Sequence, residues 1–407
     1  MLVTASKPLG AWFRVWSTDP EQGSPLDLAF QVFLILAAIV ILVRRDFDWS
    51  GAVRGNAWLM ALVIFMLIST LWSDLPLLSL KRGGKELLAV LMAFVVLSEP
   101  SPRRAVESIL RRTTYVLIPF SPVLIKYFPY YGRLYSRSSG GEMWTGVANH
   151  KNSLASICIF SVILLIWSLI RRRQGKNPAG WRYQTHAEIL ILAIALWLMG
   201  GPQGSLFYSA TSVYALIGGL LVYGGYYLAK RRKKPVSGRS LTTLVTGIIV
   251  FGTISIFTAG FGLRFFTSTA GRDATLTGRT QVWSALIPIV MRSPVVGGGF
   301  GVFWTPARRD SFDISGAHNG YLDVLLGLGF VGIILVSFFY LASCRNARRE
   351  LSHDFDWGVL CISFIIMALI HNMGESSISS FNNYLTGIVL FIAVSSTNVI
   401  RASGRTD

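Results

Sequence analysis

The residues best suited to chemistry lie in one stretch of this sequence, from Gly278 to Gly332, between two apolar runs. It contains His318, whose imidazole has an intrinsic pKa of about 6.5 and can take and give a proton at working pH. It also contains Arg279, whose planar, permanently charged guanidinium suits phosphate oxygens better than an ammonium group does. A connection that only joined two helices would be short and plainly polar. This one is long and aromatic, which predicts a site that binds an anion and moves a proton.

An interfacial helix is expected to position Arg279. The segment Thr280–Met291 follows Gly278 and precedes Pro294, so Arg279 would stand at its N-terminal end, where backbone N–H groups also attract anions. Aromatic residues typical of a membrane–water interface place this loop on the membrane surface; they are Trp283, Phe300, Phe303 and Trp304. The alternative is that Arg279 caps the loop or reaches lipid headgroups.

His318 is expected at the outer mouth of the next membrane helix. Tyr321 and Leu322 follow it at i+3 and i+4, which predicts that all three share one helical face. An ionisable ring at this position is costly unless it faces a wet cavity, so we favour a reactive role. Asn319 and Tyr321 beside it, and Trp283 in the preceding helix, are candidate substrate contacts. The alternative is that His318 only anchors the helix at the interface.

A glycine cluster, Gly297–Gly301, lies between these two candidates. Its backbone amides could cradle a phosphate group. It matches no nucleotide fingerprint, because no strand precedes it and no Gly-Lys-Ser/Thr follows. A flexible turn is therefore the preferred interpretation.

The elements that must carry these residues are membrane helices. Of 407 residues, 52% are hydrophobic and only 14% charged, with a mean hydropathy of +0.52. This composition predicts an all-α, polytopic membrane protein made of one domain, residues 1–407, with about eleven spans. A missed or re-entrant segment near the N-terminus would change that count by one. The predicted spans are Leu26–Val43, Gly55–Trp72, Glu86–Ser98, Thr113–Phe128, Ser153–Ile170, Ala187–Met199, Ser209–Ala229, Leu241–Gly260, Tyr321–Ala342, Gly358–Met373 and Tyr384–Ile400.

Lysine and arginine set the expected orientation. Twenty-three of the 38 basic residues fall on one set of loops, which is therefore predicted to be cytoplasmic. The long loop, residues 261–320, is then periplasmic, and its six arginines against three aspartates leave it positive. Basic runs beside membrane helices are ordinary stop signals, so the net charge of +18 does not indicate a nucleic-acid partner. The three cysteines lie in or beside spans and suggest no disulfide framework, and no cleavable signal peptide is visible.

Four segments resemble a known family. They are Gly278-Arg279-Thr280 with Trp283, Pro294 and the Gly297–Gly301 turn; His318-Asn319 with Gly329 and Gly332; Trp144–Asn152; and His371–Ser376. In these segments the chain resembles the bacterial O-antigen ligase and O-antigen polymerase (Wzy/WaaL) superfamily of membrane glycosyltransferases. Within it, the chain is most similar to the ExoQ-like exopolysaccharide polymerases. The resemblance runs from about Pro119 to Phe391, while the first hundred residues match mainly in hydropathy.

The resemblance implies a polyprenyl-diphosphate-linked oligosaccharide as donor, joined to a sugar hydroxyl outside the inner membrane, with no cofactor. The diphosphate leaving group needs charge stabilisation, which Arg279, Lys151 and Arg309 are placed to supply. His318 is the candidate base, and Glu375 either orients it, shares its role or is an interfacial helix end. Because the loop 261–320 has no D-x-D motif and the sequence has no His/Cys cluster with ligand spacing, we expect no catalytic metal. The expected partners are the growing polysaccharide, the bilayer, a flippase and a chain-length regulator.

One position departs from the family pattern. At the outer end of the seventh span the family has a basic residue after Ser, but this chain has Ala210 after Ser209. One diphosphate contact is therefore absent or supplied elsewhere. Lys151, Arg133 and Arg137 are the candidates, with a solvated loop as the alternative for each arginine.

Two other classes of function remain open at this point. A precursor transporter or flippase would also be apolar and polytopic, but it would more often show internal repeats and broken helices. A non-catalytic assembly partner would need no histidine beside an arginine-rich loop. Within the enzyme class, polymerase and ligase share the same donor, and the amino-acid sequence of the His318 segment favours a polymerase.

Overall fold

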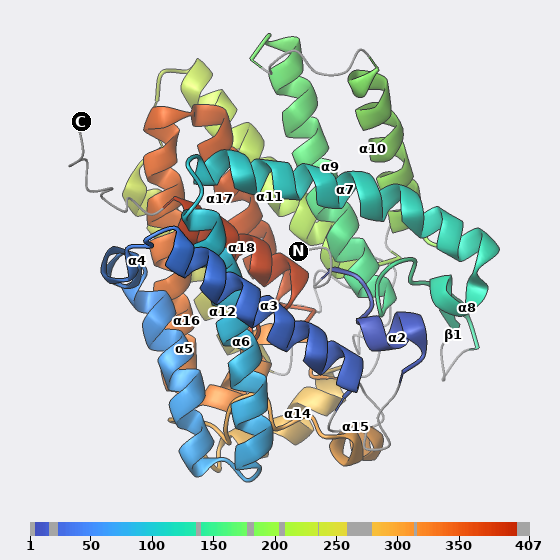
Figure 1. The fold of residues 1–407 in the computed structure, drawn as a ribbon, viewed down its shortest axis with the longest axis vertical. Coiled ribbons are helices and arrows are strands. Elements are labelled where there is room, and N and C mark those ends of the chain that lie inside the picture. The colour runs from blue at the N-terminus through green and yellow to red at the C-terminus, as the bar shows by residue number, and fades with distance from the viewer. Residues whose placement is uncertain are drawn as a thin grey trace.

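The computed structural model describes residues 5–15, 23–135, 140–176, 183–202, 208–234, 236–258, 279–312 and 316–396. These residues are almost entirely helical, and their only sheet is a two-stranded antiparallel hairpin. Figure 1 shows the longer helices gathered into one bundle. The elements in chain order are α2 (Leu9–Phe13), α3 (Pro25–Arg44), α4 (Trp49–Gly55), α5 (Ala57–Ile68), η1 (Ser69–Trp72), α6 (Pro76–Leu97), α7 (Pro102–Tyr127), α8 (Pro129–Gly132), β1 (Arg133–Tyr135), β2 (Glu142–Trp144), α9 (Lys151–Arg173), α10 (Gln184–Gly200), α11 (Ala210–Arg231), α12 (Gly238–Phe257), α14 (Arg279–Val290), α15 (Pro306–Phe312), α16 (Gly320–His353), α17 (Phe355–His371) and α18 (Tyr384–Ser395).

A helix lies at each of the eleven predicted spans. Five helices in the described residues are long and apolar enough to cross a bilayer: α3, α9, α11, α12 and α16. A bent pair, α4 with α5 and η1, makes a sixth if it is counted as one span. The chain is therefore an all-α, multi-pass membrane protein, as its composition predicts.

Two helices begin about three turns before the spans predicted for them. α6 starts at Pro76 rather than Glu86, and α7 starts at Pro102 rather than Thr113. In both cases the added turns contain several basic residues, so hydropathy does not score them. Proline suits the first helical turn because its missing N–H has no partner there anyway. The consequence for the site is that Lys81, Arg82 and Lys85 stand on a helix instead of in a loop.

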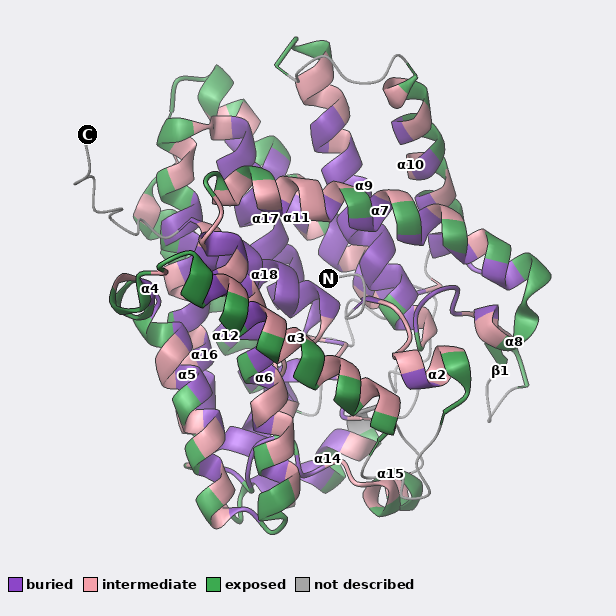
Figure 2. Ribbon diagram, viewed as in Figure 1, coloured by how far each residue is buried: buried purple, intermediate pink, exposed green. Residues whose placement is uncertain are grey.

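The centre of the bundle is α17, in which 15 of 17 residues are buried. A helix that is apolar all round must be covered on every side, and α9, α11, α16 and α18 pack against it. Phe160 of α9 stacks on Phe364 of α17 with ring centroids 4.2 Å apart. Figure 2 shows burial concentrated on these central helices, whereas α3 and α4 are largely exposed.

The long helix α16 is broken at Gly329, which has φ +61°. The segment 294–299 binds at the break: the amides of Gly298 and Gly299 donate to the carbonyls of Leu326 and Gly327 at 2.9 and 3.0 Å. A Cβ on Gly329 would lie 2.4 Å from the Val295 carbonyl oxygen, so a side chain there would push the segment away. The Gly297–Gly301 segment is thus a packed insertion rather than a flexible turn. Four of its amides, those of Gly297, Gly298, Gly299 and Phe300, already donate hydrogen bonds and are not available to cradle a phosphate group.

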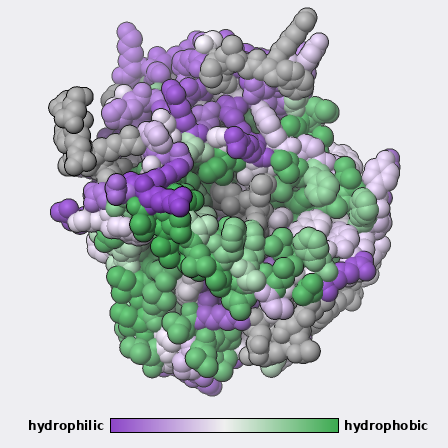
Figure 3. Space-filling model, in the orientation of Figure 1, coloured by the Kyte–Doolittle hydropathy of each residue, from purple (hydrophilic) through white to green (hydrophobic). Residues whose placement is uncertain are grey.

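The surface is divided as expected for a bilayer protein. Figure 3 shows hydrophilic residues at the upper end of the molecule and an apolar surface below it, over α3 and α5. The upper end carries the basic ends of α9, α11 and α16, among them Arg171–Arg173 and Lys230–Lys234. We call it the basic end.

Candidate active site

Glu375 is the centre of a polar cluster at the end of the bundle opposite the basic end. One of its carboxylate oxygens, Oε2, lies 3.3 Å from Nδ1 of His318. The other, Oε1, accepts a short hydrogen bond from the side-chain amide of Asn152. The side chains of His318 and Glu375 are 22% and 13% exposed, so both are largely shielded but reachable. Two of the residues named as catalytic from the sequence are therefore in direct contact.

His318 lies outside the helix that was expected to carry it. Its φ of +49° is in the left-handed region, and α16 begins two residues later, at Gly320. The expectation that His318, Tyr321 and Leu322 share a helical face is therefore wrong. The physical reason is Asn319, which caps the helix: its Oδ1 accepts the Leu322 amide at 3.1 Å and turns the chain there.

Asn319 and Tyr321 are structural residues in this arrangement, not substrate contacts. Both side chains are fully buried, with 0% exposure. The Asn319 amide also donates to the Met373 carbonyl at 3.4 Å, and the Tyr321 hydroxyl donates to the Leu369 carbonyl at 2.9 Å. Each therefore joins the start of α16 to the end of α17, which sets the separation of His318 and Glu375.

Asn372 holds the segment that carries Glu375. It is fully buried, and its Oδ1 accepts the amides of Ser377 and Ile378 at 2.8 and 2.7 Å. Its backbone carbonyl accepts the Gly320 amide at 2.9 Å. The turn after α17 is thus fixed against the first residue of α16, and the His318–Glu375 pair depends on that contact.

The start of α9 brings a cation to the cluster. His150 caps α9 through Nδ1, which accepts the Asn152 amide at 3.4 Å. Lys151 is half-buried, and its Nζ lies 4.9 Å from the centre of the Tyr208 ring. Tyr208 in turn accepts the Trp144 amide at 3.1 Å. Lys151 and Asn152 therefore enter the site together.

The start of α11 completes the cluster with hydroxyl groups. Ser209 Oγ lies 3.3 Å from the Asn152 side-chain oxygen and 3.0 Å from Ser212 Oγ, which is 3.3 Å from His371 Nε2. Ala210, the departure from the family pattern, is buried here. Tyr208, whose ring faces the Lys151 ammonium group, is two residues before Ala210. Lys151 is thus placed beside the position where the family has its basic residue.

The first turn of α14 abuts His318 through Trp283. The Trp283 indole N–H donates to the carbonyl of Ala317 at 2.8 Å. The backbone of Arg279 begins this helix, as the sequence predicts, while its side chain lies outside the described residues. Trp283 itself is 1% exposed, and Phe300 and Phe303 are also buried. The prediction that these aromatic residues lie on the membrane surface, with Trp283 as a substrate contact, is wrong because they pack inward under the site.

Of the two arginines proposed from the stretch before α9, only Arg133 lies among the described residues, and it is not brought to the cluster. The Arg133 guanidinium binds Glu142 at 3.1 Å and the Ile125 carbonyl at 2.7 Å, so it supports the β1–β2 hairpin. Arg137 lies outside the described residues. Of the two replacements that the structure describes, Lys151 and Arg133, Lys151 is the one beside the cluster.

A second polar group lies one turn along α16 from His318. Asp323 accepts the indole N–H of Trp304 at 2.7 Å. Both residues line a cavity of about 280 Å³ together with Arg82, Lys85 and Arg309. Arg309 was predicted as a substrate contact, whereas the other cations and Asp323 were missed. The sequence signal that could have indicated the missed residues was charge within or beside an apolar run.

Lys7 is a further residue that the sequence did not single out. Its Nζ donates to the carbonyls of Gly146, at 3.2 Å, and of Ala148. Burial lowers the pKa of the Lys7 amine to about 8. These contacts tie the N-terminal segment to the chain just before α9, and no motif indicates them.

Comparison with known proteins finds two matches to this sequence. A family model described as O-antigen ligase matches residues 204–337, from the segment before α11 into α16. The chain is also 26% identical over 325 residues to the exopolysaccharide production protein ExoQ of Rhizobium meliloti (strain 1021), covering 75% of this chain and 68% of that protein. That alignment is long enough to include most of the bundle. The chain is therefore similar to the O-antigen ligase family over residues 204–337 and to an ExoQ exopolysaccharide production protein over most of its length.

Proposed function

We propose that this enzyme polymerises polyprenyl-diphosphate-linked oligosaccharide repeat units at the periplasmic face of the inner membrane. The observation that carries the proposal is the contact of His318 Nδ1 with Glu375 at 3.3 Å, in a cluster that also holds Lys151. A carboxylate on one ring nitrogen fixes the tautomer and leaves Nε2 to accept a proton. The orientation assigns Glu375 as the positioning residue and His318 as the base.

The reaction needs one proton transfer and one leaving group. The acceptor hydroxyl oxygen attacks the anomeric carbon of the donor, and His318 Nε2 takes the hydroxyl proton. The bond from that carbon to the phosphate oxygen breaks, and the diphosphate leaves with the electron pair. Because the leaving group is already ionised, it requires positive charge rather than a proton. We assign this role to Arg279 and Lys151, with no metal ion required.

Two copies of the lipid-linked substrate must reach the cluster, one as donor and one as acceptor. A cavity of about 800 Å³ between α3, α6, α7 and α18 has apolar walls and is lined by Lys81 and Lys85. It reaches Asn149 beside the start of α9, and it shares Lys85 and Asn382 with the smaller cavity at Asp323. We assign the larger cavity to a polyprenyl tail, with its diphosphate at Lys81 and Lys85. The smaller cavity, with Trp304 and Arg309, then receives sugar residues, since aromatic faces suit sugars.

The charge distribution supports the periplasmic assignment. The cluster lies at the start of α9, and the basic run Arg171–Arg173 lies at its end, 23 residues away. A helix of that length spans roughly 34 Å, about the thickness of a bilayer core. If the basic end faces the cytoplasm, the His318–Glu375 cluster and the loop 261–320 face outward. A flippase and a chain-length regulator are the expected assembly partners there.

The test is the glycan made by a His318→Ala strain. Without the base, elongation should stop, so cells should carry single repeat units on the lipid carrier and no high-mass polysaccharide. The lipopolysaccharide core should be unchanged. His353→Ala is the matched control, because His353 is an exposed histidine at the far end of α16, the helix that follows His318.

The same experiment decides between polymerase and ligase, the alternative that the family match leaves open. A ligase uses the same donor but transfers a finished chain to a lipid or other acceptor. If the His318→Ala strain accumulates full-length polymer on its carrier, chain growth occurs elsewhere and the enzyme is a ligase. Normal polysaccharide in that strain would remove His318 from the mechanism altogether.

A further inference from the structure

The cations at the basic end fall into two groups with different partners. On the side of α7, α9 and α10 they are neutralised by acids. Arg171 binds Asp354 at 2.8 Å, Arg111 binds Glu188 at 3.1 Å, and Lys176 binds Asp356 at 2.6 Å. These pairs hold helices together, so they leave little charge for a ligand.

The second group, on α12 and α16, surrounds a hollow with no acid in its lining. Arg239, Arg345 and Arg348 border a cavity of about 900 Å³. A neighbouring cavity of about 670 Å³ shares Arg345 and Arg348 and adds Lys230, Lys233, Lys234 and Arg349, again with no Asp or Glu in its lining. In the part of the chain that the structure describes, no carboxylate lies within ion-pair distance of Arg239, Arg345 or Arg348. Positive charge is therefore concentrated around an open space.

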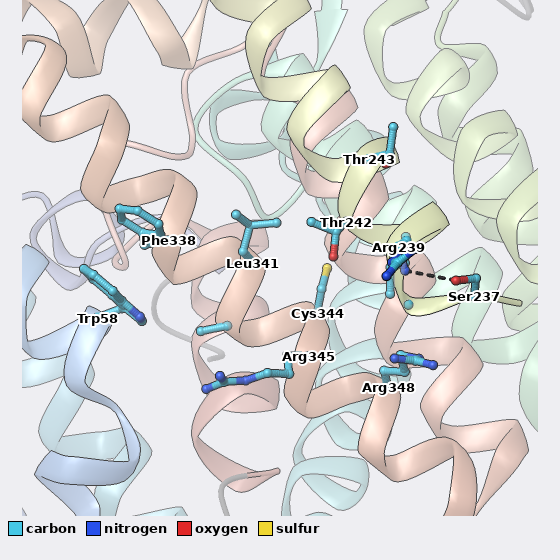
Figure 4. A pocket seen from close by; sticks show the side chains of 13 residues that line it. Trp58, Ser237, Arg239, Thr242, Thr243, Phe338, Leu341, Cys344, Arg345 and Arg348 are labelled. Atoms are coloured by element: carbon cyan, nitrogen blue, oxygen red, sulfur yellow. Dashed lines mark hydrogen bonds between the residues drawn. The ribbon is translucent and has the colours of Figure 1, made fainter.

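The hollow also has an apolar end. Figure 4 shows Trp58 and Phe338 at one end, Arg239 and Arg348 at the other, and Leu341 and Cys344 between them. The Trp58 and Phe338 rings are stacked with centroids 4.2 Å apart, and Trp58 is 41% exposed. Phe338 precedes Arg348 by ten residues of helix, or about 15 Å. That is about half the thickness of a bilayer hydrocarbon core, the depth reached by one lipid chain.

We propose that this hollow binds an anionic phospholipid, with the phosphate at Arg239, Arg345 and Arg348 and an acyl chain along Phe338 and Trp58. Guanidinium groups bind phosphate oxygens with two hydrogen bonds in a fixed plane. A basic pocket between membrane helices on the cytoplasmic side is the setting in which lipid headgroups are recognised. Basic residues that only set the orientation in the membrane need nothing but water around them. That role would explain neither the cavity nor the exposed Trp58 at its apolar end. The site lies at the opposite end of the bundle from the His318 cluster and is independent of the proposed reaction.

Native mass spectrometry of the purified full-length protein tests the charge contacts. Phosphatidylglycerol should bind more tightly than phosphatidylcholine. Replacing both Arg345 and Arg348 by Gln should weaken phosphatidylglycerol binding roughly 10- to 30-fold. The matched control is Arg231→Gln with Arg232→Gln, which removes the same charge from exposed positions of the basic end that do not line either cavity. Equal losses in the two double variants, or none in the first, would overturn the proposal.

A second measurement tests the acyl-chain contact with all arginines intact. Phosphatidylglycerol with brominated acyl chains should quench part of the tryptophan fluorescence, and Trp58→Phe should remove that part. Inorganic phosphate should give no thermal stabilisation at concentrations where phosphatidylglycerol does. If quenching is the same with Trp58→Phe, or if phosphate stabilises the protein equally well, the hollow binds no phospholipid or takes a soluble anion instead.

Discussion

At the scale of single residues, the cluster assigns unequal roles to neighbours in sequence. His318 and Asn319 are adjacent, yet His318 is partly exposed beside Glu375 while Asn319 is buried as a helix cap. The same holds for Lys151 and Asn152, of which the first faces Tyr208 and the second binds Glu375. A motif therefore contains both reacting and supporting residues, and only their contacts separate the two.

Replacing Glu375 by Gln tests whether the carboxylate positions His318. The amide oxygen can still accept from Asn152, so the fold should hold, but the charge facing His318 is lost. We expect kcat to fall by roughly 10²–10⁴, with KM for the lipid-linked substrate and the unfolding temperature nearly unchanged. Steady-state kinetics and thermal unfolding in detergent measure both. A fall in unfolding temperature that tracks the loss of activity would instead make Glu375 a structural residue.

Replacing Arg279 by Lys tests the anion-binding role at the start of α14. Lysine keeps the charge but loses the planar pair of donors. Loss of one preorganised donor typically costs about 10²–10³ in rate, so polysaccharide synthesis should fall steeply while the protein level holds. Arg292→Lys, in the same loop and just after α14, is the control. Wild-type polymer in the Arg279 variant would assign that residue to structure.

At the scale of elements, two short connections carry much of the arrangement. α16 and α17 are joined at the basic end by Asp354 alone, which caps α17 by accepting the Trp357 amide at 3.0 Å. At the other end, Asn372 and Asn319 join the same two helices beside the site. α16 and α17 are therefore fixed to one another at both ends, and the broken part of α16 at Gly329 is held by the segment 294–299.

Replacing Asp354 by Asn keeps an oxygen that can cap α17 but removes the negative charge. Burial would raise the pKa of this carboxyl, but the hydrogen bond from Arg103, the cap and the nearby Arg171 outweigh it and lower the pKa to about 2, below its ordinary 3.8. A depressed pKa contributes stability above the unfolded pKa, which is lost as pH falls from about 4 to about 2. The variant keeps a cap of similar strength, so it should lose about 2 kcal/mol of unfolding free energy at pH 7.

The pH dependence gives this prediction its control. Wild type should lose stability between about pH 4 and pH 2, and the Asn variant should lose less because it has no carboxyl to protonate at this position. Thermal unfolding followed by circular dichroism at several pH values measures the difference. Parallel curves for the two proteins would show that the Arg103 and Arg171 contacts add nothing to stability.

At the scale of the whole molecule, the charge distribution makes a topological prediction. Reporter fusions after Arg173, Lys234 and Arg349 should report the cytoplasm, and fusions within residues 261–320 should report the periplasm. Paired reporters, one active on each side of the membrane, measure this in cells. A cytoplasmic long loop would contradict the proposed mechanism, because that mechanism places the lipid-linked donor at the periplasmic face.

The sequence predicts the bundle better than it predicts the site. Apolar runs indicate membrane helices regardless of packing, so all eleven appear, and the errors at α6 and α7 come from polar turns that hydropathy cannot score. His318 and Glu375 are 57 positions apart in the sequence, and no local sequence pattern predicts that their side chains are in contact. Burial of aromatic residues is equally hard to predict from sequence. Tryptophan is typical of membrane interfaces, but tertiary packing buries Trp283.

The order of synthesis gives the cluster one more property. Asn152, His318 and Glu375 leave the ribosome in that order, and Glu375 follows Asn152 by 223 residues and His318 by 57. Until that late segment is in the membrane, His318 has no carboxylate and the proposed reaction centre does not exist. A chain whose translation stops early is then inert, so incomplete copies cannot discharge activated sugars to water while the membrane still carries them.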